Sequence, residues 1–394
     1  MKKTTQEDSK LHNSRLVLKT IYEQGETSRV EVSRLTRLTR TTVSDVVAHY
    51  IQEGLVSESG VSPSRGGKPA RLLRIVDDAR LMLGIDLAEG EFRGALVNLR
   101  GHIRLFHSLP VAEKDGEAAV ELVYALVDKL LEKADRPVQG IALGTPGLID
   151  PLRGVVLRAV NLDWSELPLV EMLSQRYPIP IYMANDSQLA ALAEFTFNRP
   201  ADSQNLALVR VGRGVGAGIV LGGKLYYGDH FGAGEIGHVR MVEGGERCRC
   251  GNNGCLETLI GSRAIVEQAR RIAERHPDSI LNQLGSSPEL NLEWVLQAYQ
   301  LGDPWIEQLV EQAGACLGLA LAHLVGGLNI LHIYIAGSVS RFGERFILAA
   351  RKEMTSRLMP AVADHTRIGA SNLGSDVVIL GAASLILSEE IGVV

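Results

Sequence analysis

The chain has 394 residues, two to three times the length of a typical domain, so two or three domains are expected. Hydrophobic residues make up 45% and charged residues 22% of the sequence, which excludes a disordered chain or a coiled coil as the main organisation. The sequence has no run of 18 apolar residues, and no apolar segment follows the lysines at its N-terminus. We therefore expect a cytoplasmic protein without a membrane span.

The net charge of −5 is distributed unevenly along the chain. Residues 1–80 carry 14 Lys and Arg against 10 Asp and Glu, whereas the remaining residues carry 27 against 36. A basic first fifth on an acidic body is compatible with an N-terminal domain that binds nucleic acid. A small positive surplus is also common on ordinary solvated surfaces, so the charge alone decides nothing.

Three short helices are predicted in the N-terminal segment. Apolar residues recur at helical spacing before Gly25, which predicts a first helix that ends there. Ser28 and Glu31 form a capping-box pattern, in which each side chain bonds the other's backbone amide, and this predicts the start of a second helix. Thr39 caps a third helix whose apolar stripe continues to Gly54.

The start of the third helix presents small polar and basic side chains outward. Two helices joined by a tight turn, with such side chains at the start of the second, are typical of a helix-turn-helix whose recognition helix enters the DNA major groove. Short polar side chains there reach base edges or phosphates. The predicted DNA contacts on this helix are Arg40, Thr41, Thr42 and Ser44.

Two predicted strands, residues 55–57 and 72–75, flank a Gly-rich loop and complete a winged helix-turn-helix over residues 1–80. Glycines let the loop backbone approach DNA, and its basic side chains bind phosphates or enter the minor groove. The predicted contacts of this wing are Arg65, Gly66, Gly67 and Lys68. The alternative is a three-helix module that binds a protein and carries a basic hairpin.

From residue 81 onward the pattern changes to alternating strands and helices. The first series comprises strands over 81–87, 92–99, 103–108 and 138–143, with a helix over 117–134. The second comprises strands over 205–211, 215–221 and 224–227, then a long insertion, a helix and a strand over 330–336. The repeated order predicts an α/β fold of two lobes, residues 81–200 and 201–394, with a small-molecule cleft between them. The alternative is a single doubly wound sheet.

Three of the four cysteines fall within eight residues, in a polar, Gly-rich segment. With the nearby imidazole of His238, the thiolates of Cys248, Cys250 and Cys255 would fill all four positions of a tetrahedral zinc ion, which makes the predicted Zn²⁺ site structural. The alternative is three reduced thiols packed as small hydrophobic side chains. Cys316 lies in an apolar helical run and is predicted to be a core residue.

The segment from Glu235 to Glu257 resembles the zinc and sugar signature of the ROK family, a group of sugar kinases and sugar-responsive repressors with a two-lobed, actin-like ATPase fold. Further matches are Gly144-Thr145-Pro146-Gly147-Leu148-Ile149-Asp150, Asn161-Leu162-Asp163-Trp164 and Asn185-Asp186. The winged helix and its loop resemble the repressor branch, typified by xylose and N-acetylglucosamine repressors. The resemblance implies a winged helix-turn-helix followed by the ROK fold, with a zinc-binding insertion and a C-terminal helix able to pack back on the first lobe.

The resemblance also implies the sugar contacts. They fall on Asn185, Asp186, Glu235, His238 and Glu257, with Asn161 lining the same pocket. Carboxylates, an amide and an imidazole supply mixed donors and acceptors for a ring of sugar hydroxyls. In the family's kinases the aspartate at position 186 is the base that deprotonates the phosphorylated hydroxyl. A simpler role for Asp186 is to cap the apolar helix that follows it.

The two phosphate loops distinguish a kinase from a repressor. The family's kinases have Asp-x-Gly-Gly-Thr where this chain has Asp86-Leu87-Ala88-Glu89-Gly90, and Gly-Thr-Gly where it has Gly212-Arg213-Gly214. Side chains replace glycines that let the backbone approach phosphate, and Glu89 adds negative charge there. We therefore expect no kinase activity and assign no catalytic residue.

The sequence thus predicts a repressor of carbohydrate uptake or catabolism genes. Its operator affinity would change when a monosaccharide or derivative binds between the lobes, and it would bind operator DNA as a homodimer or homotetramer. One alternative is an active sugar kinase with a fused DNA-binding domain. Another is a regulator that answers to a protein partner or to a phosphosugar, whose phosphate Arg213 could bind.

Overall fold

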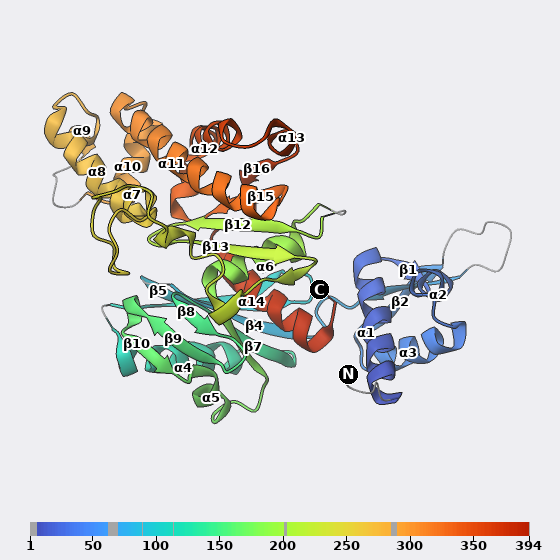
Figure 1. Cartoon of the computed structure of the whole chain (residues 1–394). Coiled ribbons are helices and arrows are strands. Elements are labelled where there is room, and N and C mark those ends of the chain that lie inside the picture. Colours follow the sequence, from blue (N-terminus) through green and yellow to red (C-terminus); the bar gives the residue numbers. More distant parts are fainter. Residues whose placement is uncertain are drawn as a thin grey trace. The chain divides into compact units, whose positions relative to one another are not determined.

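The computed structural model describes residues 6–61, 70–88, 90–112, 114–200, 203–284 and 290–393 (Figure 1). It divides into two compact units. The first unit comprises Met1–Asn185 and Val378–Val394, and the second comprises Asp186–Val377.

The N-terminal domain of the first unit contains the three predicted helices and the two predicted strands. Its helices are α1 (Gln6–Gln24), α2 (Arg29–Thr36) and α3 (Arg40–Gln52). Its antiparallel sheet has the order β1-β3-β2, formed by β1 (Thr27–Ser28), β3 (Arg71–Ile75) and β2 (Val56–Val61). Buried apolar side chains from all three helices, including Leu18, Val32 and Val47, form its core.

The starts of α2 and α3 lie where the capping residues predicted them. The Ser28 hydroxyl accepts from the Glu31 amide at 3.3 Å, and the Thr39 hydroxyl accepts from the Thr42 amide at 3.2 Å. The other predicted bond of the capping box, from the Ser28 backbone amide to the Glu31 side chain, was wrong. Both Glu31 oxygens accept from the Arg34 guanidinium, at 2.9 and 2.5 Å, because Arg34 lies one turn along the same helix.

The remainder of the first unit is built on a five-stranded sheet of order β11-β7-β4-β5-β6, which we call the first sheet. Its strands are β4 (Leu81–Leu87), β5 (Glu91–Asn98), β6 (Ile103–Pro110), β7 (Val138–Thr145) and β11 (Ile181–Asn185). β4, β7 and β11 are parallel, whereas β5 and β6 are antiparallel to their neighbours. A second, three-stranded sheet joins β8 (Leu148–Asp150), β9 (Val155–Ala159) and β10 (Trp164–Leu167), and α5 (Leu169–Ser174) follows it.

Glycines allow a helix to approach each face of the first sheet closely. A Cβ atom on Gly94 would lie 2.7 Å from Leu130, on α4 (Gly116–Glu132). A Cβ atom on Gly84 would lie 2.5 Å from the carbonyl oxygen of Ile379, on α14 (Val377–Ile386). Gly94 pairs with Ile85, so Gly84 faces the opposite side of the sheet. α14 and the turn that follows it, η7 (Leu387–Ile391), therefore pack against the first sheet, as the resemblance implied.

The second unit is built on a separate five-stranded sheet of order β14-β13-β12-β15-β16, which we call the second sheet. Its strands are β12 (Leu206–Val211), β13 (Val215–Leu221), β14 (Lys224–Leu225), β15 (His332–Ala336) and β16 (Arg367–Ala370). Its helices are α6 (Asp186–Phe197), α7 (Glu257–Ile260), α8 (Ser262–Arg275), α9 (Leu281–Leu284), α10 (Leu292–Gln300), α11 (Pro304–Leu328), α12 (Glu344–Ser356) and α13 (Pro360–Ala363). The predicted α/β class is confirmed, and two separate sheets replace the alternative of one doubly wound sheet.

The boundary between the units lies at Asn185 and Asp186 rather than at the predicted residue 200. The reason is that α6 packs on the second sheet: a Cβ atom on Gly218 would lie 2.2 Å from the Ser187 carbonyl oxygen and 2.5 Å from the Ala191 methyl carbon. Residues 378–394 belong to the first unit because α14 packs there, so the predicted second range was also too long at its C-terminal end.

Among the described helices, α11 is long and apolar enough to be a candidate membrane span by length and composition alone. Most of its apolar side chains, such as Val310, Leu317 and Leu321, are buried in the core of the second unit. α11 is therefore accounted for as a core helix.

Candidate functional site

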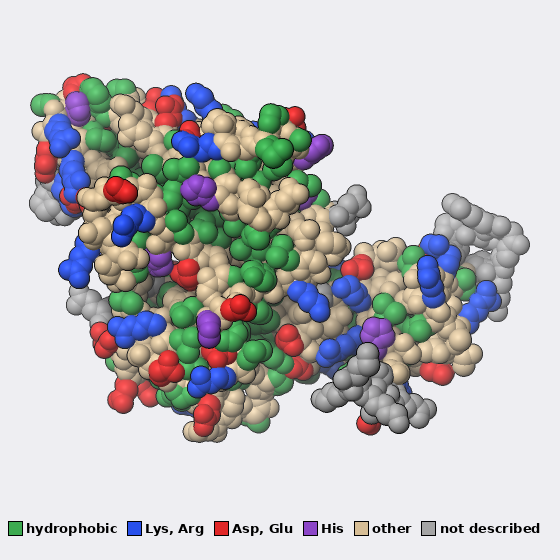
Figure 2. All heavy atoms as spheres, viewed as in Figure 1, with side chains coloured by type: hydrophobic (Ala, Val, Ile, Leu, Met, Phe, Trp, Pro, Cys, Tyr) green, Lys and Arg blue, Asp and Glu red, His purple; other side chains and the backbone are tan. Residues whose placement is uncertain are grey.

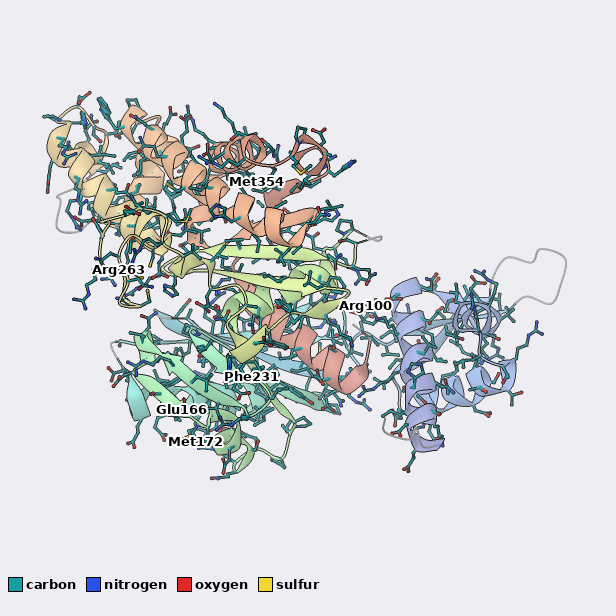
Figure 3. All side chains as sticks on the ribbon, viewed as in Figure 1. Arg100, Glu166, Met172, Phe231, Arg263 and Met354 are labelled. Carbon is teal, nitrogen blue, oxygen red and sulfur yellow. The ribbon has the colours of Figure 1, made fainter. Side chains whose placement is uncertain are left out.

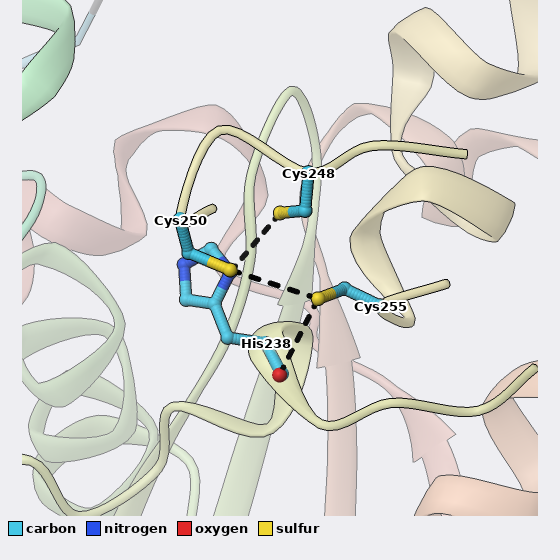
Figure 4. Close-up of side chains that lie close together, drawn as sticks. All are labelled: His238, Cys248, Cys250 and Cys255. Atoms are coloured by element: carbon cyan, nitrogen blue, oxygen red, sulfur yellow. Dashed lines mark hydrogen bonds between the residues drawn. The ribbon is translucent and has the colours of Figure 1, made fainter. Parts of the chain in front are cut away.

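One His and three Cys side chains of the second unit form a compact cluster (Figure 4). The ligand atoms of His238, Cys248, Cys250 and Cys255 all lie within 4.8 Å of one another. The Sγ atom of Cys248 is 3.5 Å from His238 Nδ1, and the Sγ atoms of Cys250 and Cys255 are 3.7 Å apart. Cys248 and Cys255 are buried and Cys250 is exposed.

These spacings fit a tetrahedral metal site. Bonds of about 2.3 Å to sulfur and about 2.0 Å to nitrogen at tetrahedral angles separate two sulfurs by roughly 3.8 Å, and a sulfur from a nitrogen by roughly 3.5 Å. The measured separations of 3.7 and 3.5 Å agree with both values. The donor set and its geometry are therefore able to hold a metal ion.

Tight backbone turns bring the four residues together. The chain from His238 to Cys255 folds back on itself, with an isolated β-bridge between Arg240 and Cys255. At Gly254 the backbone has a φ of +71°, and a Cβ atom would lie 1.9 Å from the Val242 carbonyl oxygen. A Cβ atom on Gly237, next to His238, would lie 1.9 Å from the Val215 carbonyl oxygen. No residue larger than glycine fits either position without moving the backbone.

A group of carboxylates lies beside the cluster in the same unit. The Glu235 carboxylate is 3.8 Å from His238 Nε2, the ring nitrogen that does not face the thiols. Burial raises the pKa of Glu235; His238 acts against this shift, whereas the charges of Asp186 and Glu257 add to it. The structure thus brings together four of the predicted sugar contacts, namely Asp186, Glu235, His238 and Glu257.

Both oxygens of the Asp186 carboxylate have donors. Oδ1 accepts from the Ser187 hydroxyl at 3.1 Å, and Oδ2 forms an ion pair with the Arg210 guanidinium. Only 23% of the Asp186 side chain and 22% of the Arg210 side chain are exposed. Asp186 is the first residue of α6, so it lies inside the helix that it was expected to cap.

The Glu257 carboxylate connects α7 with the turn between β12 and β13. Its Oε2 atom accepts from the Val215 amide at 3.1 Å. The same turn, Gly212-Arg213-Gly214, is held by two further bonds: the Gly212 amide donates to the Gly214 carbonyl at 3.0 Å, and its carbonyl accepts from the Ser262 amide at 2.7 Å. Two backbone amides at the second predicted phosphate loop are therefore already engaged.

The first predicted phosphate loop is only partly described. Asp86 is buried at the end of β4, Ala88 is half-buried and Gly90 is exposed, while Glu89 lies outside the described residues.

The two predicted asparagine contacts lie in the first unit. Asn185 ends β11, and its amide nitrogen donates to the Gly147 carbonyl at 3.0 Å. Gly147 is the last residue of the Gly144-Thr145-Pro146-Gly147 motif. Asn161 is exposed, in the turn η1 (Val160–Leu162) between β9 and β10.

The predicted DNA contacts on α3 form part of an exposed stripe. Arg40, Thr41 and Ser44 are exposed. Thr42 is half-buried, and its hydroxyl lies 2.9 Å from that of Thr39, so it takes part in the helix cap. Lys and Arg side chains spread over the visible face of this domain (Figure 2). The four wing residues Arg65, Gly66, Gly67 and Lys68 lie outside the described residues.

Sequence reasoning missed several residues at these sites. Arg210 is the lone charge in the apolar strand β12, and this pattern was a readable signal that a buried partner exists. Ala48 is exposed on the same stripe of α3 as Thr41 and Ser44, and its i+7 spacing from Thr41 could have identified it.

Comparisons with known proteins cover nearly the whole chain. The ROK family matches residues 82–389. A xylose repressor of Caldicellulosiruptor bescii is 30% identical over 382 residues, 96% of each chain. The crystal structure of a ROK family transcriptional regulator, a homologue of the E. coli MLC protein, has a TM-score of 0.86, 26% identity and 98% coverage of both chains.

A kinase of the same family matches a smaller part. The structure of a ROK family glucokinase from Streptomyces griseus, in complex with glucose and AMPPNP, has a TM-score of 0.71 and 29% identity. It covers 98% of the glucokinase but 77% of this chain. The family match spans more than half of the chain, and the repressor relative spans almost all of it. The chain therefore belongs to the ROK family.

Proposed function

We propose that the protein is a sugar-responsive transcriptional repressor of carbohydrate uptake or catabolism genes. The observation that carries the proposal is the extent of the match: a repressor and a transcriptional regulator of the family align over 96% and 98% of this chain, including its N-terminal domain. The protein would act in the cytoplasm, where its operator DNA is found.

In this proposal the N-terminal domain is a winged helix-turn-helix and α3 is its recognition helix. Support comes from the exposed stripe that begins with Arg40, Thr41 and Ser44, opposite the buried face of Val43 and Val47. Arg40 would bind a phosphate, and the shorter side chains would reach base edges. A homodimer or homotetramer would place two such helices about 34 Å apart on successive turns of DNA.

The effector would be a monosaccharide or a derivative of one. Proposed contacts in the second unit are Asp186, Glu235, His238 and Glu257, and those in the first unit are Asn161 and Asn185. Sugar hydroxyls both donate and accept, and carboxylates with an imidazole suit such a pattern. We propose a structural Zn²⁺ ion for the Cys₃His cluster, since four protein ligands leave no open position. With His238 Nδ1 directed at the thiols, its Nε2 hydrogen remains to be donated to Glu235 or to a sugar hydroxyl.

In this proposal the protein has no kinase activity. The reasons are the contacts made by Asp186 and by the backbone amides of the second predicted phosphate loop. A general base needs a lone pair directed at the hydroxyl that it deprotonates. Here one Asp186 oxygen is paired with Arg210, and the other accepts from the Ser187 hydroxyl. The engaged amides of Gly212 and Val215 are not available to a phosphate.

Two alternative functions are each supported by a specific observation. The glucokinase likeness keeps an active sugar kinase open, and sugar-dependent release of ADP by the purified protein would support it. Arg213, in the turn after β12, keeps a phosphosugar effector open.

The proposal is tested by fluorescence anisotropy of a labelled duplex from the region upstream of the protein's own gene, at fixed salt. The protein is titrated first, followed by a panel of neutral and phosphorylated sugars. We expect tight, sequence-dependent binding that one neutral sugar changes saturably. Binding that ignores every sugar would favour a protein partner, and absence of specific binding would contradict the DNA-binding assignment.

A further inference from the structure

A tyrosine on the strand that ends at Asn185 contacts the C-terminal turn of the chain. Tyr182 lies three residues before Asn185 on β11. Its hydroxyl donates to the Glu390 carboxylate, in η7, and the partial burial of the Tyr182 side chain raises its pKa. Met183, on the opposite face of the strand, is buried in the core that contains α4. The Tyr182 face of β11 is thus the one that the C-terminal segment covers.

The same C-terminal turn also contacts the first helix of the N-terminal domain. The Arg15 guanidinium, on α1, donates to the Glu389 carbonyl oxygen at 2.8 Å. The aliphatic part of Arg15 packs on Gly392, where a Cβ atom would lie 2.7 Å from Arg15 Cδ and the backbone has a φ of +70°. One turn of chain, η7, therefore joins the strand of a proposed sugar contact to α1.

A second contact fixes the C-terminal end of α1. The Tyr22 hydroxyl donates to the Leu99 carbonyl oxygen at 2.8 Å, in the turn between β5 and β6. Arg100, labelled in Figure 3, donates to the Tyr22 carbonyl oxygen at 2.8 Å. Its guanidinium lies 4.1 Å from the centre of the Tyr22 ring. With this end held, a displacement of η7 at Arg15 would tilt α1 about Tyr22. The buried face of α1 packs in the same core as α3, so a tilt would be passed to the recognition helix.

We propose that Tyr182, Glu390 and Arg15 are positioning residues that carry the sugar response from β11 to α1. The inference rests on the proposed function, because it concerns how sugar binding changes DNA binding. η7 is a single π-helical turn, and single π-helical turns are frequent at functional sites. Sugar bound at Asn185 would favour one arrangement of this turn, and operator DNA would favour the other.

Tyr182→Phe tests the inference because it removes one hydroxyl and leaves the ring. We expect sugar affinity of the free protein and operator affinity without sugar to stay within about twofold of the wild type. The ratio of operator dissociation constants with and without sugar should move toward one by about fivefold or more, since typical couplings are 5- to 150-fold. Glu390→Gln keeps an oxygen that accepts the Tyr182 hydroxyl and should retain most of the response.

Tyr177→Phe is the matched control. The Tyr177 hydroxyl also donates to a carboxylate, that of Asp128 at 2.7 Å on α4, but it has no contact with η7. We expect this variant to keep the wild-type ratio. Arg15→Met, which keeps the aliphatic stem but loses the bond to Glu389, provides a second test if Tyr182→Phe does not fold.

The outcomes separate the inference from the proposed function. A wild-type protein that responds to sugar, together with Tyr182→Phe and Arg15→Met variants that respond equally, would overturn the inference alone. A wild-type protein whose operator binding ignores sugar would overturn the proposed function, and the inference with it. If the Tyr182→Phe and Arg15→Met variants lose the sugar response while Tyr177→Phe keeps it, the inference is established.

Discussion

Replacement of Cys250 by serine gives the sharpest test of the metal site. Cys250 is the exposed member of the cluster, so the substitution removes one ligand and disturbs little packing. At a free zinc concentration about 100 times the dissociation constant, bound metal stabilises a folded domain by about 2.7 kcal/mol. The second unit has roughly 190 residues, and for domains of that size each kcal/mol shifts the melting temperature by about 2–4 °C. We therefore expect zinc to raise the wild-type Tm by about 5–11 °C.

The assay is a thermal melt with zinc and with a chelator, together with the metal content of the dialysed protein. Wild type should hold one zinc per chain and lose the stabilisation in chelator, whereas Cys250→Ser should melt at the chelated temperature under both conditions. Cys316→Ser is the control, because Cys316 lies on α11 away from the cluster and should keep the full response. A Cys250→Ser protein that retains one zinc and the wild-type melt would refute the assignment.

Three further predictions concern the sugar contacts, the DNA face and the metal-binding loop. Arg210→Leu should weaken sugar binding by about tenfold, or about 1.4 kcal/mol, since Asp186 loses the donor that fixes it; unchanged affinity by calorimetry would contradict this. Arg40→Ala should weaken binding to all duplexes and lower the slope of log affinity against log salt by about one; a loss confined to one sequence would instead indicate base readout. Gly237→Ala should destabilise the second unit by about 1–3 kcal/mol through its contact with a backbone oxygen. Gly232→Ala has open space and should melt like the wild type.

Most regular elements could be predicted from local patterns. The strands β4 and β13 are largely apolar runs between turn signals, and Ser28 and Thr39 marked two helix starts. The three-stranded sheet β10-β9-β8 was missed because its strands are short and mix polar with apolar residues. β1 was missed because it has two residues and exists only through its pairing with β3.

The candidate site also contains parts that local sequence predicts and parts that it does not. The Cys₃His cluster could be predicted because its residues lie within 18 positions of sequence and share one loop. The pairing of Asp186 with Arg210 could not, because it joins a helix to a strand 24 residues away. The return of α14 to the first sheet depends on packing at Gly84, which local periodicity does not report. The resemblance to the family supplied that expectation.

Thermodynamic linkage offers the most direct test of the central claim, which is that one chain couples a sugar to operator DNA. Sugar is titrated into the free protein and into the protein saturated with operator duplex, in the same buffer, by calorimetry. If sugar changes operator affinity by a given factor, operator must change sugar affinity by the same factor. We expect the two factors to agree and to differ from one. Equal sugar affinity with and without operator would contradict it.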